Sequence, residues 1–73
     1  MGTSDTVAEL AISLAEEGKD TAEAVVDLRE ASQGRRVSVV MAKQKLTGAD
    51  NDRDTTGAVA LLDETLKTED WTY

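Results

Sequence analysis

Carboxylates are the main side chains of this 73-residue chain that could take part in chemistry, because Cys and His are absent. The chain has fifteen Asp and Glu and eight Lys and Arg. Adjacent acids occur as Glu16-Glu17, Asp63-Glu64 and Glu69-Asp70. Neighbouring positions of a helix diverge by about 100°, so no such pair converges on one substrate as general acid–base catalysis requires. With no thiolate, no imidazole and no glycine-rich phosphate loop, we expect neither enzymatic activity nor a bound cofactor.

A metal site is considered over Asp50-x-Asp52-x-Asp54, where alternating carboxylates match the start of a calcium-binding EF-hand loop. That loop needs glycine at its sixth position and glutamate at its twelfth, where this chain has Thr55 and Leu61. We therefore predict a polar loop over residues 49–54 and no metal site.

Positive charge prevails only in residues 31–49, which hold four bases and no acid, whereas the chain as a whole has a formal charge of -7. Four bases are few for phosphate binding, and no aromatic residue lies among them to stack on a nucleotide base. We expect no direct nucleic-acid binding, and predict that the bases pair with the acidic faces of residues 21–33 and 55–68, within the fold or across a dimer. They are Arg35, Arg36, Lys43 and Lys45.

Both aromatic residues, Trp71 and Tyr73, lie in the short C-terminal stretch 69–73, after two acids. Aromatic side chains often anchor protein–protein interfaces, so this tail could dock on a partner. Alternatively, Trp71 folds back and closes a core that has no other large side chain. The sequence leaves both interpretations open.

Three segments have the periodicity of amphipathic helices: 5–17, 21–33 and 55–68. Asp-Thr pairs precede or open each of them and are suited to capping the first turn, and Gly18, Gly34 and Gly48 are placed as residues that terminate helices. The sequence predicts an all-α fold, a bundle of three to four short helices in a single domain over 1–73.

The segment 35–47 is ambiguous. Residues 36–41 are rich in β-branched side chains and partly alternating, which suits a short strand. Residues 42–46 are good helix formers, and no second strand is visible with which the segment could pair. We favour a helix.

The chain has few large residues with which to build a core, since it has no Phe and only one Trp. A core of this size rarely contributes more than about 3–5 kcal/mol to the free energy of unfolding. We therefore expect oligomerisation or a partner to bury further apolar surface. The segment 5–17 is apolar around most of its circumference, and we expect it to supply the anchors for this contact. They are Val7, Leu10, Ile12 and Leu14.

No apolar run is long enough to cross a membrane, and the N-terminal stretch lacks the features of a secretory signal, so we expect a cytoplasmic protein without membrane contact. The function that the sequence favours is a small acidic interaction module that adapts or regulates a partner protein. One alternative is a structural component of a larger assembly, such as a phage-like particle. Another is a DNA mimic whose carboxylates imitate phosphates, including Glu9, Glu16, Glu23, Asp27 and Glu30.

Overall fold

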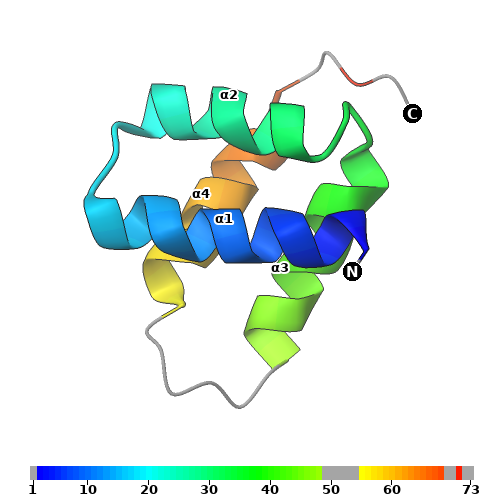
Figure 1. Cartoon of the computed structure of the whole chain (residues 1–73), viewed down its shortest axis with the longest axis horizontal. Helices are drawn as coiled ribbons and strands as arrows, with labels where there is room; N and C mark the ends of the chain where they lie inside the picture. The colour runs from blue at the N-terminus through cyan, green and yellow to red at the C-terminus, as the bar shows by residue number, and fades with distance from the viewer. Residues whose placement is uncertain (1, 49–54, 69–70, 72–73) are drawn as a thin grey trace.

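The computed structural model describes residues 2–48, 55–68 and 71. Throughout this part of the chain the fold is all-α, as predicted, and the segment 36–41 is helical rather than a strand. The described residues form four helices: α1 (Thr3–Glu17), α2 (Thr21–Ala31), α3 (Arg36–Gly48) and α4 (Thr56–Leu66) (Figure 1).

The helices form a bundle with two central and two outer members. α1 and α2 run side by side in opposite directions, and α4 crosses behind α1 (Figure 1). α1 and α4 each pack against all three other helices, whereas α2 and α3 make most of their contacts with these two. The core therefore lies where α1 crosses α4.

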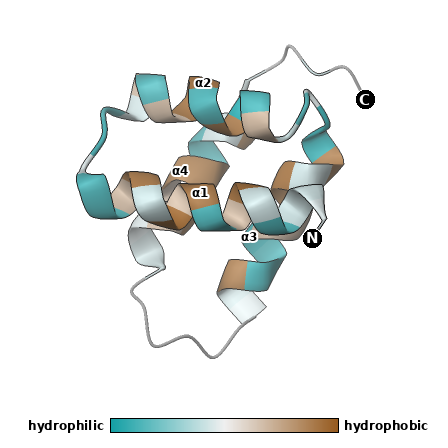
Figure 2. Cartoon of the chain, viewed as in Figure 1, coloured by the Kyte–Doolittle hydropathy of each residue, from teal (hydrophilic) through white to brown (hydrophobic). Residues whose placement is uncertain are grey.

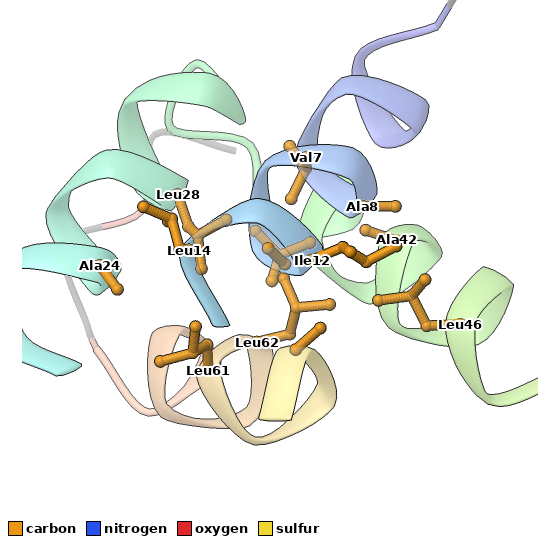
Figure 3. Close-up of a cluster of buried hydrophobic side chains, with 13 residues drawn as sticks. Val7, Ala8, Ile12, Leu14, Ala24, Leu28, Ala42, Leu46, Leu61 and Leu62 are labelled. Carbon is orange, nitrogen blue, oxygen red and sulfur yellow. The ribbon is translucent and has the colours of Figure 1, made fainter. Parts of the chain in front are cut away.

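The core is built from small and medium-sized aliphatic side chains. Five of its thirteen buried members are alanines, and the largest that are completely buried are Leu28 and Leu62. Side chains from all four helices converge around Ile12 (Figure 3). The buried apolar residues are Val7, Ala8, Ala11, Ile12, Leu14, Ala24, Leu28, Val39, Ala42, Leu46, Ala58, Leu61 and Leu62.

Small residues bring the two central helices close together. A Cβ atom at Gly57, in the first turn of α4, would lie 3.2 Å from the Cβ of Ala15 in α1. Two helix backbones come this near only where neither carries a large side chain at the crossing, and close approach restores dispersion contacts that small side chains would otherwise lose. The scarcity of large residues is thus offset by short distances between helices.

One copy of the chain covers its own core. The accessible surface is 4442 Å², against about 4400 Å² expected for a folded monomer of this mass. The sequence led us to expect an oligomer or a partner protein to cover the apolar circumference of residues 5–17, whereas α1 packs against α2, α3 and α4 of the same chain. No second polypeptide is needed to bury α1.

α1 begins earlier than the sequence indicated. Its N-cap is Gly2, and the backbone N–H of Gly2 donates to the carboxylate of Asp5, 3.4 Å away. The expected cap at Asp5-Thr6 is wrong, because Asp5 acts from the third helical position, where an acid also interacts favourably with the helix dipole. The predicted caps of the second and fourth segments are confirmed in position, at Asp20 and Thr55, although neither side chain makes a capping hydrogen bond.

α1 ends in a Schellman motif at the predicted glycine. Gly18 has a left-handed backbone with φ of 70°. The N–H of Lys19 donates to the carbonyl of Leu14 over 3.1 Å, and that of Gly18 donates to Ala15 over 3.2 Å. These bonds satisfy carbonyls that the helix end would leave unpaired.

The end of α2 differs from the prediction by one residue. Gln33, not Gly34, takes the first left-handed position (φ 59°), and its N–H donates to the carbonyl of Glu30. Gly34 follows, also left-handed, and donates to Arg29. The sequence favoured the glycine because a side chain costs free energy in this conformation. Gly48 lies inside α3 as its last residue and is not left-handed. It was predicted to follow the helix as a left-handed cap, and that prediction is also wrong.

Replacing Gln33 by Gly should stabilise the fold. The left-handed conformation costs a residue with a Cβ atom about 1–2 kcal/mol, and the greater freedom of glycine in the unfolded chain costs about 0.5–1 kcal/mol. We expect the free energy of unfolding, measured by urea titration, to rise by about 0.5–1 kcal/mol for Gln33→Gly. Gly34→Ala is the control and should lower it. A less stable Gln33→Gly protein would contradict this account of the turn.

Substitution of Gly57 tests the contact between α1 and α4. Gly57→Ala should be less stable than Gly48→Ala by about 1–2 kcal/mol, because Gly48 has open space around it. Both changes add a methyl group to a terminal turn of a helix, so their difference in thermal unfolding isolates the contact. In an Ala15→Gly background the penalty at Gly57 should disappear. Equal effects at both glycines would show that the crossing tolerates a wider spacing.

Candidate functional site

The apolar residues predicted to anchor a partner are mostly core residues. Val7, Ile12 and Leu14 are buried among the other helices, and Leu10 is half-buried against the same cluster. They lie on several sides of α1, which packs against α2, α3 and α4. Exposed anchors must therefore be sought on other helices.

Trp71 packs against the core from the C-terminal side of α4. It is half-buried, and its indole N–H donates to the carbonyl of Thr68 over 2.7 Å. The guanidinium carbon of Arg29, in α2, lies 5.6 Å from the centre of its ring, within the range of a cation–π interaction. This geometry supports the interpretation in which Trp71 closes the core. Tyr73 lies outside the described residues.

Two of the predicted basic contacts are ion pairs within the chain. Lys43 Nζ is 2.5 Å from Asp63 Oδ1 in α4, which is the kind of partner expected. Lys45 Nζ is 2.6 Å from Asp5 Oδ1, so its partner belongs to α1 instead of α2 or α4. All four side chains are partly exposed, and such pairs contribute on the order of 0–1 kcal/mol each. They attach α3 to the two central helices.

Arg35 and Arg36 have exposed side chains at the start of α3. α3 contains three bases and no acid, whereas each of the other three helices has a net negative charge. Because Lys43 and Lys45 face carboxylates, Arg36 carries most of the positive charge that α3 presents to a partner. Its end of the helix is also the positive end of the helix dipole.

Exposed large apolar side chains lie on two helices. Val37 and Met41, one turn apart in α3, have exposed fractions of 59% and 45%, and Val26 in α2 has 53%. α3 packs on the core through Val39 and Leu46, so its opposite side carries apolar residues that the described chain leaves about half exposed. Figure 2 shows apolar and polar residues alternating along this helix.

The candidate site is this outward side of α3, which we call the α3 outer face. It combines two apolar side chains and one amide with Arg36 at one edge and, at the other, Lys45, which pairs with Asp5. Val37, Met41 and Gln44 are spaced by four and three residues and form a continuous strip on one side of the helix. The α3 outer face consists of Arg36, Val37, Met41, Gln44 and Lys45, all exposed.

The sequence does not distinguish Val37 and Met41 from the core residues of α3. Apolar residues occur on all sides of this segment, so periodicity alone does not choose the buried side. The buried apolar residues are Val39, Ala42 and Leu46. Val26 was missed because it lies among the acids of α2.

Two surface ion pairs shift the pKa of one of their members, Asp5 in the first and Lys19 in the second. The Lys45 side chain and the Gly2 backbone N–H hold the pKa of Asp5 below its ordinary value of 3.8, so this pair stabilises the fold above that pH and less as pH falls through the lower value. Asp27 raises the pKa of Lys19 above 10.5, and that contribution is lost only above the raised value. Lys19 also neutralises the charge of Asp27, one of the carboxylates that would imitate phosphates in a DNA mimic.

Comparison of the chain with models of known protein families, with curated protein sequences and with solved structures finds no significant match. Among residues 2–48, 55–68 and 71, no group of His, Cys, Asp or Glu is arranged to hold a metal ion. The aspartates at 50, 52 and 54 lie outside these ranges. No helix in the described part of the chain is both long and apolar enough to cross a membrane.

Truncation of Trp71 distinguishes its two interpretations. Trp71→Ala should lower the free energy of unfolding by about 1–3 kcal/mol, less than for a fully buried Trp, since the side chain is only partly buried. Trp71→Phe keeps a ring beside Arg29 but loses the N–H donor, and should cost about 0.5–1.5 kcal/mol. Thermal unfolding measures both. An unchanged melting temperature for Trp71→Ala would show that the ring does not close the core.

Proposed function

We propose that the protein is a small, non-enzymatic interaction module that binds an acidic partner protein through the α3 outer face. The observation that carries the proposal is the pair Val37 and Met41, which are exposed on successive turns of the one helix with net positive charge. Apolar residues exposed next to one another on a small protein are typical of interaction sites. Regulation or adaptation of that partner is the corresponding role.

The chemistry of this face defines the partner. Val37 and Met41 would be buried against apolar side chains, contributing on the order of 1 kcal/mol each because about half of each is still exposed. Arg36 would form a charge-assisted hydrogen bond to a carboxylate at the edge of the contact. The complement is an amphipathic helix or groove with apolar residues flanked by Asp or Glu. Methionine and arginine are also enriched at protein interfaces.

A charge substitution on the α3 outer face tests the proposal. Met41→Glu removes apolar area and sets a negative charge against an acidic partner, so partner affinity should fall at least about tenfold. Val26→Lys is the matched control, because it replaces another exposed apolar residue by a charge but lies on α2. Proteins captured from native lysate by the wild type should be retained by Val26→Lys and lost by Met41→Glu.

The captured protein is then purified and its affinity for all three proteins measured by calorimetry. Circular dichroism must show the same helix content and melting temperature in each, since both substituted side chains are exposed. A partner that binds Met41→Glu as tightly as the wild type would overturn the proposal. So would a captured species that is nucleic acid rather than protein.

A further inference from the structure

A second exposed face matches the α3 outer face in shape and opposes it in charge. We call it the α2 outer face; it lies on the side of α2 that points away from Ala24 and Leu28 of the core. Val26 is at its centre and two glutamates lie beside it. It consists of Ala22, Glu23, Val26 and Glu30, all exposed.

The two faces are complementary. Each centres on exposed apolar side chains, and together they hold all the exposed large apolar residues of the described chain: Val26 on one, Val37 and Met41 on the other. The α2 outer face has two acids and no base, while the α3 outer face has no acid and carries the positive charge of Arg36; its second base, Lys45, is paired with Asp5 of the same chain. The α2 outer face therefore has the composition deduced above for the partner of α3.

We propose that the α2 outer face of one copy docks on the α3 outer face of a second copy. This inference rests on the proposed function, since it uses the same α3 surface, and it makes self-association and partner binding mutually exclusive. α2 and α3 are different helices with few contacts to each other, so the two faces of one molecule do not cover one another. Val26 packs beside Val37 and Met41, and Arg36 meets Glu23 or Glu30.

The contact is heterologous, because the two copies contribute different surfaces. After one contact forms, each dimer still has one free α2 outer face and one free α3 outer face. Association of this kind continues to a closed ring or an open chain. The wild-type protein is therefore expected to pass beyond a dimer as its concentration rises, and salt should weaken the association by screening the charges.

Analytical ultracentrifugation tests the inference on the full chain. The mean mass of the wild type should at least double between about 10 μM and about 1 mM at low salt, the range in which weak contacts form. Met41→Glu and Val26→Lys should each remain monomeric at every concentration, because each blocks one of the two faces. A wild type that stays monomeric at about 1 mM would overturn the inference.

Mixing the two variants distinguishes a heterologous from a symmetric contact. Met41→Glu retains an intact α2 outer face and Val26→Lys an intact α3 outer face, so an equimolar mixture should form a 1:1 dimer that grows no further. A monomeric mixture would refute the proposed contact. If Val26→Lys associates by itself, the interface joins α3 to α3 and the inference is wrong.

The results of these experiments distinguish failure of the self-contact from failure of the proposed function. Loss of self-association in Val26→Lys, with partner binding retained, supports both. A monomeric wild type whose partner binding still depends on Met41 refutes the self-contact alone. Partner binding unaffected by Met41→Glu refutes the proposed function, even where the wild type self-associates through the same residue.

Discussion

The fold depends on the short distance between α1 and α4. A chain without Phe, whose only Trp lies at the edge of the core, cannot fill wide spaces between helices. Both helices contribute buried alanines to the core, and Gly57 approaches Ala15, so the two helices come close enough for their atoms to make dispersion contacts. The accessible surface of the 73-residue chain, 4442 Å², is about that expected for a folded monomer of its mass.

The way in which α3 packs on α1 and α4 leaves apolar residues on the surface. α3 packs on the central pair through Val39, Ala42 and Leu46, and two ion pairs from Lys43 and Lys45 fix its orientation. Once the helix is held in this way, Val37 and Met41 must point outward. The exposure of the candidate site is thus a consequence of how α3 is attached.

Helix periodicity and glycine positions were enough to predict the all-α fold, because three periodic segments and one ambiguous segment without a second strand allow few other folds. The ends of the helices were harder to predict. Gly2 caps α1 because Asp5, inside the helix, accepts its N–H. Gln33 adopts a left-handed backbone at a cost in free energy that a glycine would not have. The site was not predictable, because α1 and α3 are apolar on several sides. Which side is buried is decided by packing against helices distant in sequence.

The crossing of the first and last helices also governs how the chain acquires its structure. Ala15 and Gly57 are far apart along the sequence, so the central contact forms only after a long loop has closed. Neither the α1–α2 pair nor the α3–α4 pair contains that contact, and each would leave one side of its core in water. The bundle is thus expected to fold cooperatively, as a single unit without a stable half.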